Sequence, residues 1–135
     1  MLLVCFLGAN ALAAPAPKVY VVPVEEMIDP GLASFIERSI GEAEEEQADL
    51  ILLEIDTPGG MVDSAMEIRK SIDRTKTPVV ALVKGGAISA GAYITLACPK
   101  IAMVPGSTIG DAEPQLSTGE KVDEKILSFW AAEMG

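Results

Sequence analysis

The chain has 135 residues; half of them are hydrophobic but only 4% are aromatic, and the formal net charge is −10. This length predicts one domain with an aliphatic core, and the acidic balance argues against nucleic acid as a partner. The absence of histidine excludes a Ser-His-Asp triad within the chain and every histidine-ligated metal site, while the two cysteines are too few for a zinc cluster. We therefore expect no metal and no cofactor.

Residues 1–17 carry no charged side chain. An apolar run at 2–8 precedes Ala11, Leu12 and Ala13, a small-x-small pattern that is typical of signal-peptide cleavage sites. We expect 1–17 to be a signal peptide and leader, cleaved after Ala13, and 18–135 to form the domain; an uncleaved apolar N-terminus is the alternative. Export would leave Cys98 as the single cysteine, which allows no internal disulfide.

From residue 18 onwards, apolar runs typical of buried strands alternate with amphipathic helical segments. Strands are predicted at 19–24, 50–56, 79–83 and 100–104. Helices are predicted from Pro30, between Met61 and Arg74, at 90–97 and from Val122 onwards, with a tight loop at 105–110 and a longer loop at 111–120. Strand–helix units in succession predict an α/β fold with a mostly parallel sheet covered by helices. The last helical pattern stops at Gly135, so we expect a domain that is incomplete at the C-terminus.

Four glutamates gather near the end of the first predicted helix, at Glu42, Glu44, Glu45 and Glu46. They are compatible with a cation site, but such charge runs are far more often solvated helix faces. We favour the solvated face.

Ser89 lies between small residues where the strand predicted at 79–83 passes into the helix predicted at 90–97. A helix N-terminus offers free backbone N–H groups and the positive end of a dipole, and small neighbours allow a substrate backbone to approach. The pattern is related to the Gly-x-Ser-x-Gly nucleophile elbow, with Ala87 in place of its first glycine. An ordinary N-cap serine is the alternative.

Two glycine pairs lie near Ser89 in the predicted sheet. Gly59 and Gly60 follow the second strand, and Gly85 and Gly86 precede the serine. Ligands of α/β sheets bind beyond the carboxyl ends of the strands, and backbone N–H groups there can hold an oxyanion. A tight turn is the alternative for each pair.

Residues 56–60 (Asp-Thr-Pro-Gly-Gly), followed about thirty residues later by 86–93, resemble the Clp-type serine protease superfamily. The chain is most similar to the NfeD-type membrane-bound proteases, partners of stomatin-like proteins, and next to signal peptide peptidase A. Residues 101–110 also resemble the strand and loop that follow the nucleophile helix in these families. The resemblance covers roughly residues 19–130 and implies a Clp-protease/crotonase-like fold and a homo-oligomer. It also implies membrane attachment through regions outside this chain, on the periplasmic or extracytoplasmic face.

The resemblance also implies roles for single residues. Ser89 matches the nucleophile, Gly60 and Ala90 match the backbone donors of the oxyanion hole, and the substrate is expected along Gly59, Gly86, Ala87 and Ile88. The base would be a lysine, for which Lys125 matches best and Lys121 is the second candidate; a solvated helix lysine is the alternative for Lys125. A lysine acts as a base only when neutral, which requires burial that lowers its pKa by several units from about 10.4.

These features predict a serine endopeptidase with a Ser-Lys dyad, acting through an acyl-enzyme on hydrophobic segments of stomatin-like membrane proteins. A crotonase-type acyl-CoA enzyme shares the fold and the glycine-built oxyanion hole, and a non-catalytic peptide-binding module is the third possibility. We expect apolar Ile126, Phe129 and Trp130 to contribute to oligomer contacts.

Overall fold

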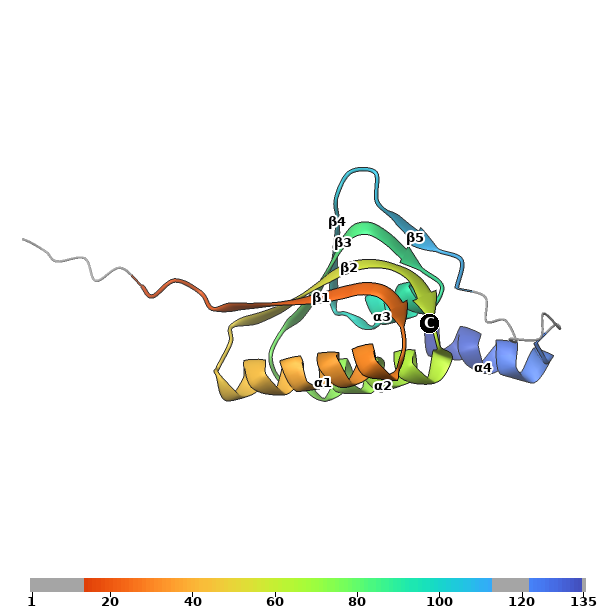
Figure 1. The fold of residues 1–135 in the computed structure, drawn as a ribbon, viewed down its shortest axis with the longest axis horizontal. Coiled ribbons are helices and arrows are strands. Elements are labelled where there is room, and N and C mark those ends of the chain that lie inside the picture. The colour runs from red at the N-terminus through yellow and green to blue at the C-terminus, as the bar shows by residue number, and fades with distance from the viewer. Residues whose placement is uncertain (1–13, 113–121, 135) are drawn as a thin grey trace, which may run out of the picture.

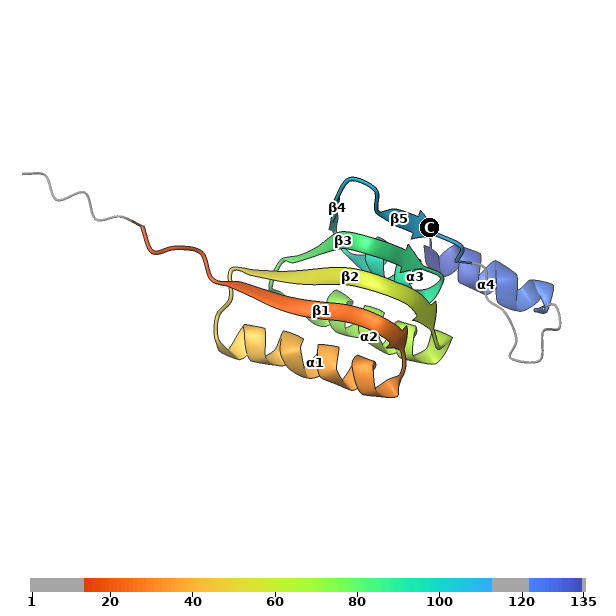
Figure 2. The same ribbon diagram turned by 45° about the horizontal axis from the view of Figure 1, so that its top comes forward.

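The computed structural model describes residues 14–112 and 122–134, in which strands and helices alternate (Figure 1). The elements are β1 (Val19–Ile28), α1 (Pro30–Glu45), β2 (Leu50–Gly60), α2 (Val62–Arg74), β3 (Val79–Ile88), α3 (Ala90–Ala97), β4 (Lys100–Met103), β5 (Thr108–Gly110) and α4 (Glu124–Met134). The strands form a parallel sheet in the order β1-β2-β3-β4, and β5 pairs with the end of β3 (Figure 2). The predicted α/β fold with a parallel sheet is therefore confirmed.

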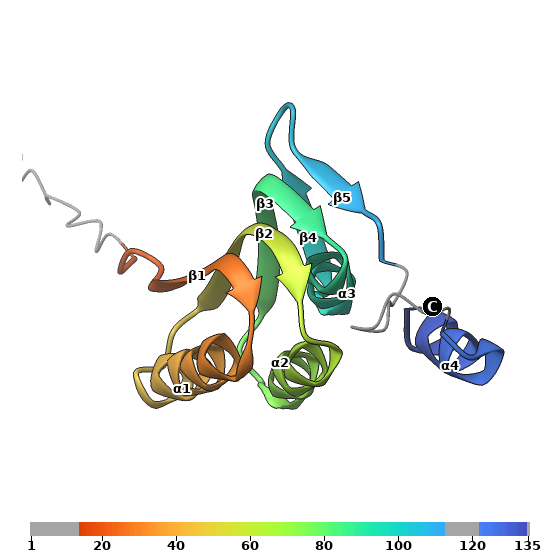
Figure 3. The same ribbon diagram turned by 45° about the vertical axis from the view of Figure 1, so that its right-hand side comes forward.

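Helices α1, α2 and α3 pack on one face of this sheet (Figure 3). Successive strands are added to the sheet in one direction, from β1 to β4. Right-handed crossovers between them therefore place all three helices on the same side. Alternate side chains of β1, β2 and β3 bury against Ile36, Ile40, Ile68 and Ile72 of the helices. The composition predicted helices covering the sheet, but the described helices cover one face only. Val21 is exposed on the other face, and all four residues of the edge strand β4 are exposed.

Helix α1 begins as the sequence predicts. The Asp29 carboxylate accepts a hydrogen bond from the Leu32 N–H at 2.8 Å, and Pro30 occupies the first turn, where its missing N–H costs no hydrogen bond. Helix α3 has the predicted bounds.

The four glutamates near the end of α1 are exposed, which agrees with a solvated face. Three of them tie α1 to neighbouring segments: Glu42 accepts from the Tyr20 hydroxyl, Glu44 from the Thr75 hydroxyl, and Glu46 pairs with Lys18. The hydrogen bond from Thr75 lowers the pKa of Glu44.

The first three strands begin where predicted but run four or five residues further. The prediction ended β2 and β3 too early because their extensions contain Pro58 and several glycines, which are poor strand formers. It ended β1 too early because Pro23 and two glutamates follow its apolar run. The extensions are also irregular: the register shifts between Glu25 and Met27 of β1, and again between Ile55 and Thr57 of β2. Such bulges bend strands and re-aim the residues that follow. Residues 105–110 were expected to be a loop throughout, but 108–110 form β5.

Cys98 is buried at the end of α3, where its thiol donates to the Ile94 carbonyl. Burial, with a smaller contribution from the charge of Asp73, raises the pKa of Cys98 to about 12. Above the ordinary pKa, the unfolded chain loses this proton while the folded chain keeps it, so stability falls as pH rises from about 9 towards 12. We expect urea unfolding to show a loss of about 1 kcal/mol at pH 10 relative to pH 8 that is absent in Cys98→Ala. An identical pH slope in both proteins would contradict this assignment.

Candidate active site

Ser89 occupies a strained turn between β3 and α3. Its backbone has φ 55° and ψ −120°, in the left-handed region that residues with a side chain rarely adopt. The Ser89 N–H donates to the Gly110 carbonyl at 2.8 Å, and its own carbonyl accepts from the Ala92 N–H at 2.9 Å. Although Ser89 stands at the N-cap position, its side chain makes no capping hydrogen bond. The ordinary capping alternative is therefore wrong, and the half-buried hydroxyl is available for other chemistry.

Gly59 lies directly against Ser89. A Cβ placed on Gly59 would lie 2.8 Å from the Ser89 Cβ and 2.8 Å from the Ile88 carbonyl oxygen, and the φ of Gly59 is 103°. The neighbouring Gly60 lies even closer to β1, since its Cβ would meet the Ile28 carbonyl oxygen at 2.2 Å. The pair ends strand β2, so the tight-turn alternative is wrong. Glycine is needed here because no side chain fits between the strand end and the serine.

This contact predicts a large effect of Gly59→Ala and a small effect of Gly106→Ala. Both glycines have positive φ, but nothing lies within 4 Å of a Cβ at Gly106. Backbone strain alone should cost Gly106→Ala about 1 kcal/mol of unfolding free energy. Strain and steric overlap together should cost Gly59→Ala about 3 kcal/mol or displace Ser89. Urea denaturation checks the difference, and equal costs would show that Gly59 does not press on the serine turn.

The second glycine pair is held by Asp56. The Gly86 N–H donates to the Asp56 carboxylate at 3.0 Å, and a Cβ on Gly85 would lie 2.2 Å from the same carboxylate oxygen. Ala87 is fully buried, so any contact with a substrate must come from its backbone, whereas Ile88 is half-buried beside Ser89. The pair lies inside β3, so the tight-turn alternative is wrong for it as well.

Backbone donors approach Ser89 from two directions. Ala90 begins α3, and the first N–H groups of a helix have no acceptor within it. The Ala90 nitrogen lies 3.3 Å from the Cβ position of Gly59, so the end of β2 and the start of α3 converge at the serine. Developing negative charge at this point would be stabilised by the helix dipole and by backbone N–H groups.

The structure does not bring Lys125 to Ser89. Lys125 lies in the first turn of α4, where its side chain is exposed and its N–H donates to the Asp123 carboxylate at 2.7 Å. The residue that α4 turns towards α3 is Trp130. Five residues correspond to about 140° around a helix, so Lys125 points away from this contact. The expectation that Lys125 is buried over the site is therefore wrong for a single copy of the chain. Lys121 lies outside the described residues.

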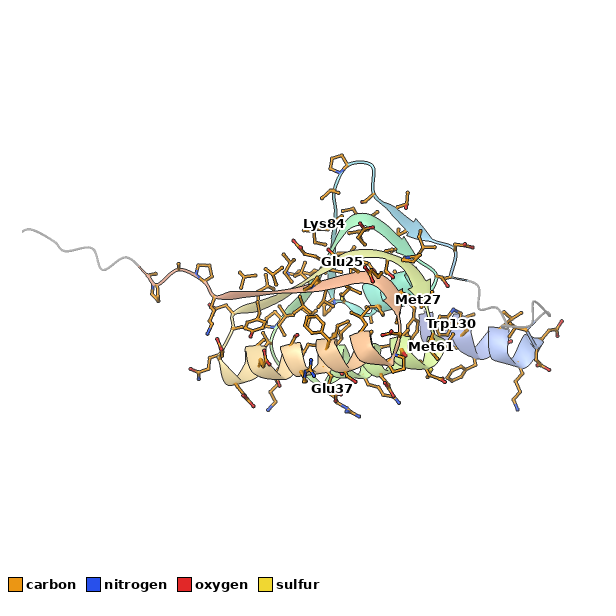
Figure 4. The ribbon with its side chains drawn as sticks, viewed as in Figure 1. Glu25, Met27, Glu37, Met61, Lys84 and Trp130 are labelled. Atoms are coloured by element: carbon orange, nitrogen blue, oxygen red, sulfur yellow. The ribbon has the colours of Figure 1, made fainter. Side chains whose placement is uncertain are left out.

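Lys84 is the lysine nearest to Ser89 in sequence, and it lies on the face of the sheet opposite α1 (Figure 4). It pairs with Glu54 at 3.0 Å, and the hydrogen bond to that carboxylate raises the pKa of Lys84. The amine is held in its charged form, which agrees with the expectation that Lys84 is not a catalytic base.

An aromatic stack that the sequence did not predict attaches α4 to the body. The Tyr93 and Trp130 rings stack with centroids 4.4 Å apart, and the Arg69 guanidinium lies 5.2 Å from the Tyr93 ring centroid. The Trp130 indole N–H donates to the Ala112 carbonyl at 2.6 Å. Trp130 was expected at an oligomer contact, but it is only 6% exposed and packs within the chain. The sequence signal that could have identified Trp130 as a core residue is that it is the single tryptophan in an aromatic-poor sequence.

Trp130→Ala should release α4 from α3. Loss of a buried tryptophan costs about 3 kcal/mol, so amide hydrogen exchange in α4 should become about 100-fold faster. Phe129→Ala is the matched control, because Phe129 is 52% exposed and should leave exchange almost unchanged. Equal effects of the two substitutions would show that the stack does not hold the helix.

Together, the parallel sheet, the serine on a strained strand–helix turn and the converging backbone donors define a ClpP-like fold. The family model for the NfeD1b N-terminal domain matches residues 18–135, and the chain belongs to this family. Membrane protein NfeD1b of Bacillus subtilis (strain 168) is 45% identical over 134 residues, covering 98% of this chain and 30% of the relative. Membrane-bound protease PH1510 of Pyrococcus horikoshii is 38% identical over 140 residues, covering 98% of this chain and 31% of the relative.

Two solved structures of the 1510-N membrane-bound stomatin-specific protease have the same fold. A serine-to-alanine mutant superposes with TM-score 0.81 at 33% identity, covering 89% of this chain and 62% of that one. A lysine-to-alanine mutant in complex with a substrate peptide superposes with TM-score 0.80 at 34% identity, covering 87% of this chain and 57% of that one. These matches confirm the predicted family and the Clp-protease-like fold. The chain spans about a third of the length of its curated relatives. Among residues 14–112 and 122–134, no helix has the length and hydrophobicity needed to cross a membrane.

Proposed function

We propose that this domain is a serine endopeptidase with Ser89 as its nucleophile. The observation that carries the proposal is the Ser89 turn, whose hydroxyl makes no capping hydrogen bond while Gly59 packs against its Cβ. Strain at a nucleophile is retained where it serves the chemistry. The relatives named as proteases, one of them with a bound peptide, support the same assignment.

In the proposed reaction, the Ser89 oxygen attacks the scissile carbonyl carbon while its proton passes to a lysine amine. The Gly60 and Ala90 N–H groups bind the oxyanion. Gly60 is the better donor of its pair, because the Gly59 N–H is already donated to the Thr57 hydroxyl oxygen at 3.1 Å. Collapse of the intermediate releases the amine product with a proton from the lysine and leaves an acyl ester on Ser89, which water then hydrolyses.

Lys125 is the proposed base. In 1510-N, the replaced serine and lysine are 41 positions apart. In this chain, Lys125 lies 36 positions after Ser89, five fewer, and Lys121 lies 32 positions after it, nine fewer. The smaller difference favours Lys125. Because Lys125 is exposed here, its amine must reach Ser89 through a movement of α4 or from α4 of a second copy in a homo-oligomer.

We propose hydrophobic segments of stomatin-like membrane proteins as substrates. Met27 and Met61 are exposed and lie at the end of the sheet where β1 and β2 terminate (Figure 4), so apolar side chains flank the glycine pair. Residues 1–17 are proposed as the signal peptide of an exported protein, attached to the membrane by regions outside this chain.

The proposal is tested by incubating the full-length protein with a peptide from the hydrophobic segment of a stomatin-like protein, and with a polar peptide of equal length. Mass spectrometry should find a single cut in the first peptide, with a new carboxylate and a new amine. Turnover of an acyl-CoA thioester without peptide cleavage would favour the crotonase-type alternative. Saturable peptide binding without any product would favour the binding module.

A further inference from the structure

We infer that Thr57 is a positioning residue that holds the oxyanion-hole segment (residues 58–60) against Ser89. Its catalytic consequence rests on the proposed function, whereas the structural role does not. Thr57 belongs to the Asp-Thr-Pro-Gly-Gly motif but has no part in the proposed chemistry. Its side chain is 2% exposed, which is unusual for a hydroxyl unless hydrogen bonds compensate its burial.

The Thr57 hydroxyl connects two irregular strand ends. It donates to the Glu26 carbonyl of β1 and accepts from the Gly59 N–H at 3.1 Å. Glu26 is the positive-φ residue of the β1 bulge, and Thr57 follows the register shift of β2. Regular ladder bonds are interrupted at both places, so this one hydroxyl supplies a connection that the sheet does not.

The Thr57 methyl group fixes the same segment from the helix side. A Cβ on Gly91 would lie 2.5 Å from the Thr57 Cγ2, so α3 approaches β2 closely at this point. Gly91 is two residues after the proposed nucleophile, and Gly59 is two residues after Thr57. The spacing between Gly59 and Ser89 is therefore set by Thr57 through its hydroxyl on one side and its methyl on the other. Small displacements of such groups cost much activity, because the oxyanion donors must meet charge that develops in the transition state.

The test compares three variants of the full-length protein. Thr57→Val keeps the shape and removes the hydroxyl, while Thr57→Ser keeps the hydroxyl and removes the methyl. Thr95→Val is the matched control, because Thr95 is also fully buried but its hydroxyl bonds only within α3, to the Gly91 carbonyl at 2.8 Å. Each variant is measured for kcat and KM on the cleaved peptide, and for hydrogen–deuterium exchange in a fragment that contains Gly59.

We expect Thr57→Val to lower kcat by about 10- to 100-fold with KM within about twofold, and to speed exchange at Gly59. Thr57→Ser should lose less kcat than Thr57→Val, because it keeps both hydrogen bonds and loses only the methyl contact with α3. Thr95→Val should keep both the rate and the exchange of the native protein. Equal losses of kcat in Thr57→Val and Thr95→Val, or unchanged exchange at Gly59 in Thr57→Val, would overturn the inference. If the native protein cleaves no peptide, the proposed function fails, and exchange at Gly59 alone then decides whether Thr57 holds the segment.

Discussion

Replacing Ser89 by alanine is expected to reduce peptide cleavage by about 10⁴-fold or more, because the nucleophile is lost. The fold should survive, since the Ser89 hydroxyl makes no capping hydrogen bond that alanine would remove. Ser34→Ala is the control, because Ser34 is an exposed serine of α1 and should have native activity. Initial rates of peptide cleavage and urea unfolding of the same preparations provide both readouts.

The strain at this position gives a second readout. Ser89→Gly should be as inactive as Ser89→Ala but about 1 kcal/mol more stable than the native protein, because glycine adopts φ 55° without steric cost. A gain in stability with loss of activity is expected at a strained functional residue. Retained cleavage in both variants, or a less stable glycine variant, would contradict the role assigned to the turn.

Lys125→Ala should lower kcat nearly as far as Ser89→Ala, because a dyad fails when either member is missing. Lys121→Ala is the control and should keep most of the activity. Since Lys125 is exposed and α4 contacts the body through Trp130, Lys125→Ala should not change the unfolding free energy by more than about 0.5 kcal/mol. Steady-state kinetics with urea denaturation checks both statements.

Mixing the two inactive variants distinguishes the routes by which the amine reaches the serine. If Lys125 acts on Ser89 of a second copy, mixed oligomers of Ser89→Ala and Lys125→Ala should recover part of the native rate. If α4 moves within one chain, mixing should recover nothing. Native activity of Lys125→Ala, with loss in Lys121→Ala, would transfer the role of base to Lys121.

Much of the fold followed from sequence periodicity. Aliphatic runs located the starts of β1, β2 and β3, and the Asp29-Pro30 pair located the start of α1. Hydrophobic patterns identify segments whose side chains alternate or recur, which is why they work for regular elements. They fail for β5, since residues 108–110 are held by pairing with β3 and not by any pattern of their own.

The site was predicted in part. The serine turn and the Gly59–Gly60 pair could be found because glycine and serine have positional meaning at strand and helix ends. The role of Thr57 depends on a bulge in β1, thirty-one residues away, and a single motif does not reveal a bulge. The position of Lys125 depends on which face of α4 docks, and this is decided by the ring of Trp130 stacking on Tyr93. Helical periodicity offers several apolar faces and does not select among them.

The most direct measurement is reaction of the native protein with a fluorophosphonate probe, followed by mapping of the adduct by tandem mass spectrometry. An activated serine reacts with such a probe, whereas an ordinary surface hydroxyl does not. We predict one phosphonyl group per chain, located on Ser89, and no adduct after unfolding or in Ser89→Ala. An unlabelled Ser89 in a folded protein that still cleaves the peptide would contradict the assignment of the nucleophile.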